Sequence, residues 1–337
     1  MSSFIPAFVE QLTALRYSRT TPEQLRTPDT QALFTALFNN QLKAQVGPEV
    51  AEQASQLVAH YYKAVQLCRK NELTAALAQL HLTDARQAGL PAPAVEFVTL
   101  FQLSAWGNYY YKNGEGTRGI DTLLHGLSIS ARLEQEGYEV FIHRRIEQLH
   151  NIATIYLKQQ QYEQAHALIK NTLTFVHSGQ ASGLFIADWD GALLGRVKLF
   201  QEATLEDSLG RMAGHNTQLM DHPTYGNEFY YQHYLRDLLR DLATTTYNRL
   251  VLHNWLYAKA SYFEQGPEAF FRNVLEFLSD PDITPNYDVF RANLLAQAIW
   301  AIRQQPVPQQ AELIATIQQF SDAHLLDRMG KVIKLAA

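Results

Sequence analysis

The chain has 337 residues, 47% hydrophobic content and a formal net charge of −5, so it has ample apolar material for a large core. No basic excess marks a phosphate-binding surface, and no stretch approaches the ~20 apolar residues of a membrane helix, so we expect neither a nucleic-acid partner nor a membrane anchor. The single cysteine, Cys68, excludes an internal disulfide framework and predicts a reducing, cytoplasmic location.

Two amphipathic helices are predicted within residues 1–46. Apolar side chains at helical spacing indicate the first over residues 4–17 and the second around residues 33–42. This N-terminus has no basic head and does not resemble a signal peptide. Thr21-Pro22 and Thr27-Pro28 each offer a helix cap followed by proline at the first helical position. We expect this region to form an N-terminal cap, which a helical solenoid needs to cover its apolar end.

One spaced pattern occurs three times between residues 60 and 173. In each copy a small residue is followed three positions later by a large one, nine further by a second small residue, and four further by a large apolar one. The members are Ala64, Leu67, Ala76 and Leu80; Gly107, Tyr110, Gly119 and Leu123; Ala153, Tyr156, Ala165 and Ile169. Copies that lie 43 and 46 residues apart indicate stacked helical hairpins. The small residues would let two antiparallel helices approach closely, and the large residues would fill the seam beside them.

This pattern resembles the tetratricopeptide repeat, and copy three matches it best. The usual repeat length of that family is about 34 residues, so the helices or turns must be longer here, and the closing proline is absent. The resemblance covers about a third of the chain and implies an all-α, right-handed solenoid of antiparallel helix pairs with no sheet. On this basis we place three hairpins in residues 47–178. The resemblance also implies that the first helix of each hairpin lines a concave face, and its groove positions map onto Tyr61, Cys68, Asn108, Tyr111, Glu147, His150 and Thr154.

Residues 179–337 keep helical spacing but lose the repeat. The serine- and glycine-rich segment 178–183 predicts a domain boundary. Breaks between helices are expected near residues 221–227, 243–246 and 304–309. No segment alternates apolar and polar residues over a strand length, so no sheet is predicted. We expect irregular helical pairs that continue the solenoid.

Three short motifs favour structural over chemical roles. Gly114–Gly119 fits G-x-G-x-x-G, but a predicted helix rather than a strand precedes it, which indicates an interhelix turn. Glu147-Gln-Leu-His150 is a single E-x-x-H, whereas di-iron bundles need a second copy and two further glutamates. Asp188–Gly191 starts like a calcium loop but lacks its later ligands, which indicates a turn or a helix start. No catalytic residue, cofactor or metal site is therefore predicted.

The groove positions mix aromatic and polar side chains, which suits a peptide segment or a small ligand. Because three adjacent tyrosines on one helix cannot all face one way, at least one of residues 109–111 should reach a groove. We expect a non-catalytic scaffold that binds a protein or peptide partner on its concave face. Two alternatives stay open: a ligand-sensing regulatory module of the same fold, and an all-helical, metal-dependent enzyme using Glu147 and His150.

Overall fold

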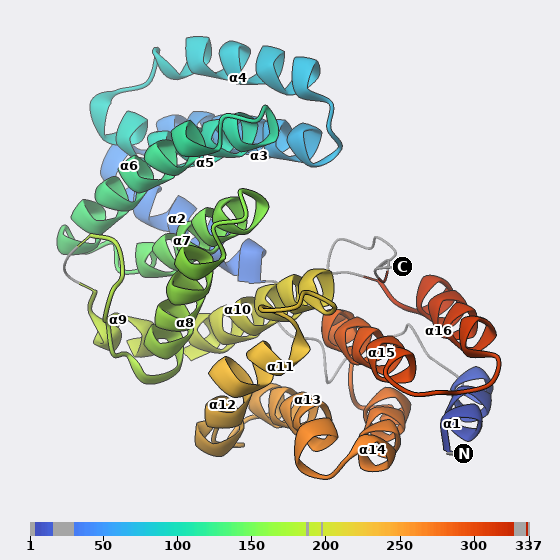
Figure 1. Ribbon diagram of the computed structural model, residues 1–337. Coiled ribbons are helices and arrows are strands. Elements are labelled where there is room, and N and C mark those ends of the chain that lie inside the picture. Colours follow the sequence, from blue (N-terminus) through green and yellow to red (C-terminus); the bar gives the residue numbers. More distant parts are fainter. Residues whose placement is uncertain (1–3, 16–29, 187–188, 197, 327–334, 336–337) are drawn as a thin grey trace. The chain divides into compact units, whose positions relative to one another are not determined.

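The computed structural model describes residues 4–15, 30–186, 189–196, 198–326 and 335. Within these ranges the chain is helical and has no strand, which confirms the all-α prediction for this part of the protein (Figure 1). The helices pack against neighbouring helices of the chain, in the manner of a helical repeat. The predicted proline-containing caps at Thr21 and Thr27 lie outside the described residues.

The chain divides into two compact units. The first, here called the hairpin unit, is Pro28–Leu205, and the second, the terminal unit, combines Met1–Thr27 with Glu206–Ala337. The helices of the hairpin unit are α2 (Thr30–Val46), α3 (Pro48–Arg69), α4 (Leu73–Gln87), α5 (Ala92–Lys112), α6 (Gly116–Gln135), α7 (Phe141–Lys158), α8 (Tyr162–Ser178) and α9 (Gly191–Arg196). The boundary between the units falls within α10 (Lys198–Leu219).

The terminal unit takes its helices from both ends of the chain. They are α1 (Phe4–Ala14), α11 (Asn227–Tyr230), the π-helical turn η2 (Tyr231–Leu235), α12 (Arg236–Asp241), α13 (Tyr247–Glu264), α14 (Pro267–Ser279), the 3-10 turn η3 (Pro285–Tyr287), α15 (Asp288–Arg303) and α16 (Gln310–His324). Breaks predicted near residues 221–227, 243–246 and 304–309 all fall between these helices. No helix in the described ranges combines the length and the apolar character that crossing a membrane requires.

Three hairpins, α3/α4, α5/α6 and α7/α8, turn in the same way. The middle residue of each turn has a left-handed backbone: φ is +62° at Asn71, +86° at Gly114 and +59° at Gln160. In each turn the next N–H bonds the carbonyl five residues back, as in Glu72 to Leu67 at 2.9 Å, and this bond satisfies a carbonyl at the end of the first helix. These three residues stand at the same place in the sequence repeat, so the repeat seen in the sequence is also a repeat of the backbone.

The small residues lie where the helices of each hairpin meet. A Cβ atom on Gly107 would lie 2.9 Å from Cγ of Leu123, and one on Gly119 would lie 3.1 Å from the carbonyl oxygen of Gly107. In the other two hairpins the small residues are alanines with at most 1% exposure: Ala64, Ala76, Ala153 and Ala165. The predicted close approach of the paired helices is therefore confirmed.

Glycines on α6 also allow the following helix, α7, to pack closely against it. A Cβ on Gly126 would lie 2.9 Å from the side-chain amide of Gln148, and a Cβ on Gly119 would lie 3.4 Å from a methyl of Ile155. A buried ion pair of 2.7 Å between Arg145 and Glu134 links the same two helices. Because removing one partner would leave an uncompensated buried charge, this pair fixes how α6 and α7 meet.

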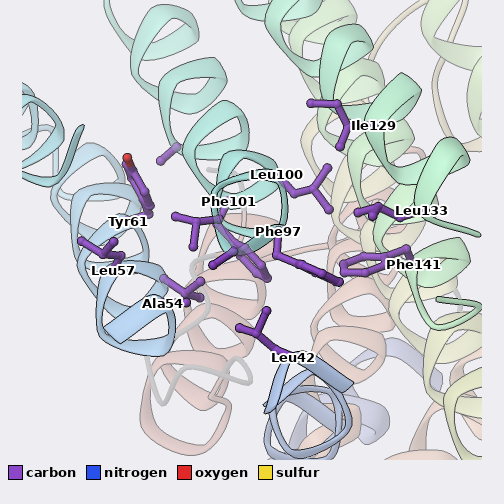
Figure 2. Packing of buried hydrophobic residues seen from close by; sticks show 14 of the residues in the cluster. Leu42, Ala54, Leu57, Tyr61, Phe97, Leu100, Phe101, Ile129, Leu133 and Phe141 are labelled. Atoms are coloured by element: carbon purple, nitrogen blue, oxygen red, sulfur yellow. The ribbon is translucent and has the colours of Figure 1, made fainter. Parts of the chain in front are cut away.

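The core of the hairpin unit joins helices from different hairpins. Figure 2 shows Leu42 of α2, Tyr61 of α3, Phe97 of α5 and Phe141 of α7 among its buried side chains. Phe97 lies 4.8 Å from the ring of Tyr138 in an edge-to-face arrangement, the geometry that aromatic pairs prefer. Helix α2 thus packs on α3 and α5, at the start of the three hairpins.

Helix α1 packs elsewhere. It contacts α14 and α16, with the rings of Phe4 and Phe8 at 5.7 and 4.8 Å from the ring of Phe271. The predicted cap, residues 1–46, is therefore divided: α1 belongs to the terminal unit and α2 to the hairpin unit. Periodicity shows that a helix is amphipathic but carries no information about which distant apolar surface it covers.

Candidate functional site

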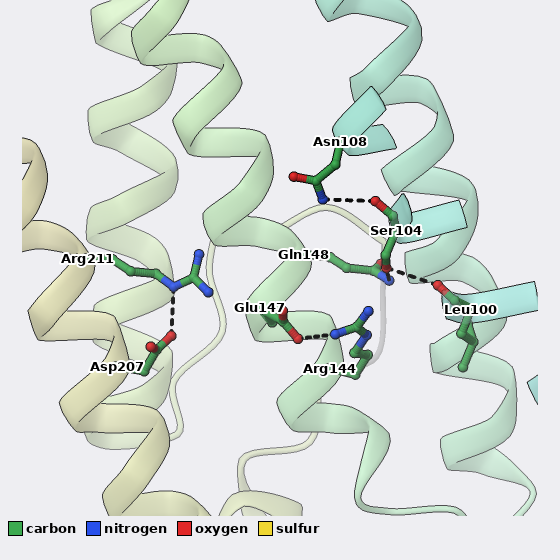
Figure 3. A network of polar contacts seen from close by, with 8 residues as sticks. All are labelled: Leu100, Ser104, Asn108, Arg144, Glu147, Gln148, Asp207 and Arg211. Carbon is green, nitrogen blue, oxygen red and sulfur yellow. Dashed lines mark hydrogen bonds and ion pairs between the residues drawn. The ribbon is translucent and has the colours of Figure 1, made fainter. Parts of the chain in front are cut away.

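Side chains of α5 and α7 contact each other at positions that lie almost one repeat apart. The guanidinium of Arg144 lies 5.0 Å from the ring centre of Phe101. The amide of Gln148 donates to the hydroxyl of Ser104 at 3.4 Å, and Figure 3 shows both of these side chains. The two partners in each pair stand almost one repeat apart in the sequence, so α5 and α7 run in the same direction. Successive first helices of a hairpin stack that line one common surface have this arrangement.

Polar side chains continue along both helices beyond these contacts. Asn108 donates to the carbonyl of Ser104 at 2.9 Å, and Thr154 donates to the carbonyl of His150 at 2.9 Å. Because these bonds run back to the preceding turn of the same helix, they hold both side chains in fixed rotamers. Asn108 and Thr154 are half-buried and line a recess with Tyr111 and Asn151.

The recess is small. Its volume is about 30 Å³, and Gly107, Leu123 and Ile155 complete its lining. Small-molecule sites commonly measure about 300–1,000 Å³, whereas one water needs about 10–15 Å³, so this space admits a single small group and not a whole ligand. Burial raises the pKa of Tyr111, and its phenol therefore stays neutral and able to donate at physiological pH.

The structure separates the seven residues predicted to line the groove. Asn108, Tyr111 and Thr154 come together at the recess. The side chain of Glu147 is 36% exposed on the same helix as Thr154 and forms an ion pair with Arg144 (Figure 3).

Three of the seven lie in the interior, so for them the groove assignment is corrected. Tyr61 is 1% exposed, Cys68 is 0% exposed and His150 is 2% exposed. The hydroxyl of Tyr61 lies 2.7 Å from a carboxylate oxygen of Asp84 and 2.6 Å from the amide oxygen of Gln87, both on α4. Burial raises the pKa of Tyr61, which keeps this hydroxyl a neutral donor. The spacing placed these residues on the correct helix but could not show the depth at which they lie.

Asp84 is the centre of a polar cluster that the sequence did not reveal. Besides Tyr61, it accepts from the amide of Gln102 at 2.9 Å and from the indole of Trp106 at 3.0 Å. The cluster ties α3, α4 and α5 together, and such fully connected networks specify a single packing arrangement. Cys68, also a predicted groove position, is 0% exposed, and burial raises the pKa of its thiol to about 11.

The three short motifs have structural roles. Residues 113–115 form the turn between α5 and α6, as predicted for the glycine-rich motif. Asp190 accepts from the N–H of Ala192 at 2.8 Å and thereby caps α9, while Asp188 lies outside the described residues. Among the described residues no group of three histidine, cysteine or carboxylate side chains is placed to hold a metal ion. In the E-x-x-H motif, Glu147 is paired with Arg144 and His150 is buried.

A larger pocket occurs in the terminal unit. Its volume is about 500 Å³, and it lies between the segment 220–233 and the end of α15, where Trp300 and the capping residue Gln304 line it. For this segment the sequence predicted only a break near residues 221–227. The pairing with Trp300 depends on tertiary structure, because some seventy residues separate the two parts of the wall.

Comparison with known proteins gives no relative: no protein-family model, curated protein or solved structure matches this chain.

Proposed function

We propose that this protein is a non-catalytic scaffold that binds an extended peptide or a segment of a partner protein across α5 and α7. The arrangement proposed is a tetratricopeptide-like, right-handed solenoid, in which α5 and α7 are successive helices of the concave face. The observation that carries the proposal is the recess lined by Asn108, Tyr111, Asn151 and Thr154, which offers several polar groups but room for only one group of a ligand.

The chemistry of the recess suits a peptide backbone. An asparagine amide both donates and accepts, so it can pair with the N–H and the C=O of one extended residue. Tyr111 supplies a large contact area with few rotatable bonds, as anchor residues at interfaces do. Glu147 and Arg144 lie nearer the N-terminus of α7 than the recess does. They add a charged pair that can orient the partner.

Selection from a random peptide library on the full chain tests the proposal, with affinities measured by fluorescence anisotropy. We expect Tyr111→Ala and Asn108→Ala each to weaken binding of a selected peptide about tenfold or more, which is about 1.4 kcal/mol. The stability of both variants should stay within about 0.5 kcal/mol of the parent, because both side chains are half-buried. Matched controls are Tyr257→Ala and Asn254→Ala, at exposed positions of α13.

Two results would contradict the scaffold proposal. One is a library that yields no peptide with saturable binding. The other is a selected peptide whose affinity is the same for both site variants and both controls.

The alternative, a ligand-sensing module, has its own supporting observation. The pocket in the terminal unit has the volume of a small-molecule site, whereas the recess between α5 and α7 is too small for one.

A further inference from the structure

The pocket between residues 220–233 and the end of α15 has a polar lining without cationic side chains. None of the described residues that line it is a lysine or an arginine, whereas Asp221 and Glu228 contribute carboxylates. Asp221 is paired with Arg303 at 2.7 Å, and Glu228 accepts from Gln232 at 3.0 Å. The charge of Asp221 is compensated by Arg303, but the carboxylate of Glu228 would repel an anionic ligand, which is therefore disfavoured.

The backbone fixes the tautomers of two histidines in the wall. Nδ1 of His222 accepts from the N–H groups of Thr224 and Tyr225, at 3.2 and 3.0 Å, so the proton of its neutral ring is on Nε2. His233 has the opposite form: its Nδ1 lies 3.0 Å from the carbonyl oxygen of Phe229, which can only accept, so the proton is on Nδ1 and Nε2 is an acceptor. One pocket thus contains a donor imidazole and an acceptor imidazole.

A buried lysine sets the orientation of a third polar group. The amine nitrogen of Lys259, a residue 1% exposed, lies 3.0 Å from the amide oxygen of Asn227 and 2.8 Å from that of Gln297. With its oxygen held by Lys259, the amide of Asn227 directs its NH₂ group the other way. That nitrogen is buried, and no described group accepts a hydrogen bond from it. Asn227 belongs to the wall of the pocket, but this nitrogen is buried behind the surface that a ligand would touch.

Aromatic rings complete the wall. Phe229 and His233 stack with ring centres 3.9 Å apart, and Trp300 is held by Tyr262 at 5.0 Å in an edge-to-face contact. His233 lies in the π-helical turn Tyr231–Leu235, and π-helical turns of this kind recur at functional sites. The flat rings offer apolar surface for C–H groups, while their neighbours offer hydrogen bonds.

We propose that this pocket binds a neutral polyhydroxylated molecule, that is, a small carbohydrate. A hydroxyl group donates one hydrogen bond and accepts two, so a ring that bears several hydroxyls matches the donor of His222 and the acceptor of His233. The carboxylates of Asp221 and Glu228 accept from hydroxyls without requiring a positive charge on the ligand. Trp300 and Phe229 face the C–H groups of the sugar ring. The volume of about 500 Å³ suits a ligand of this size.

The experiment is ligand-observed NMR followed by calorimetry on the full chain. The probes are D-glucose, N-acetyl-D-glucosamine and maltose, with D-glucuronate and D-glucosamine as charged counterparts of similar size. We expect at least one neutral sugar to bind saturably, about tenfold or more tightly than either charged one. His233→Phe keeps a ring against Phe229 but removes the Nε2 acceptor, and it should weaken that binding about tenfold.

His125→Phe, at an exposed position of α6, is the matched control and should bind as the parent does. The proposal is overturned if no neutral sugar binds at millimolar concentration, or if glucosamine or glucuronate binds most tightly. It is equally overturned if His233→Phe and the control bind alike. The pocket lies within the terminal unit, so these outcomes are independent of peptide binding by α5 and α7.

Discussion

The closest contact between paired helices predicts a large effect for one substitution, Gly107→Leu. A Cβ at this position would lie 2.9 Å from Cγ of Leu123 and 3.4 Å from the carbonyl oxygen of Gly119. Leucine adds three more carbons to a space that does not hold the first. Overpacking of a close-packed interior costs about 1–3 kcal/mol, and we take the upper end because a backbone atom is among the neighbours. Replacing a helical glycine regains about 1 kcal/mol, so the expected net loss is about 2 kcal/mol.

Gly214→Leu on α10 is the matched control. No atom lies within 4 Å of a Cβ built there, so only the gain in helix propensity applies. We expect this variant to equal or exceed the parent in stability by up to about 1 kcal/mol. The two identical exchanges should therefore differ by about 3 kcal/mol.

Urea unfolding followed by far-UV circular dichroism measures both variants, and an unchanged m value shows that stability alone has changed. Gly107→Ala provides an intermediate step and should lose less than the leucine variant. The reasoning is refuted if Gly107→Leu is as stable as Gly214→Leu, because the seam between α5 and α6 would then be loose.

The remaining predictions concern turns, a buried amine and a buried thiol. In urea unfolding, Gly114→Ala should lower the free energy of unfolding by about 1 kcal/mol, and Gln160→Gly should raise it by about 0.5–1 kcal/mol. The reason is that a left-handed backbone costs a non-glycine residue about 1–2 kcal/mol, whereas glycine costs about 0.4–1 kcal/mol in chain entropy. A change of the same sign in both variants would contradict this reasoning. Burial lowers the pKa of Lys259 well below 10.5, so the unfolded chain binds more protons just below that pH and folding stability should rise with pH there. Against Lys259→Met, which removes this titration, the parent should gain up to about 1.4 kcal/mol per pH unit between pH 8 and 10, and parallel curves would exclude a shifted amine. Cys68, fully buried with a pKa of about 11, should react with Ellman's reagent at pH 8 far more slowly in the folded protein than in urea; equal rates would show the thiol to be accessible.

The sequence was most informative where structure is local. The spacing of Gly107, Gly119 and Leu123 predicted the seam between α5 and α6 because one turn of helix sets which residues share a face. The turn at Gly114 was predictable for the same reason, since a short connection between two helices must reverse the chain within a few residues. These features depend on neighbours within about twenty positions, which a periodic pattern records.

The sequence was less informative about depth and about distant partners. Tyr61 and His150 were assigned to a groove, yet both are buried, because helical phase gives the direction of a side chain but not what covers it. The division of residues 1–46 has the same origin, since α1 covers α14 and α16, helices that occur more than 250 residues later in the chain.

By itself, then, the sequence determined that the chain is helical, where its hairpins turn and which small residues hold each pair together, because all three follow from contacts within one hairpin. Only the tertiary structure decided which polar residues converge on α5 and α7, and that a pocket joins residues 220–233 to Trp300. The contact of Lys259 with Asn227 was likewise decided only by the tertiary structure. Contacts of this kind join segments whose separation in the chain has no fixed period, so no spacing in the sequence can report them.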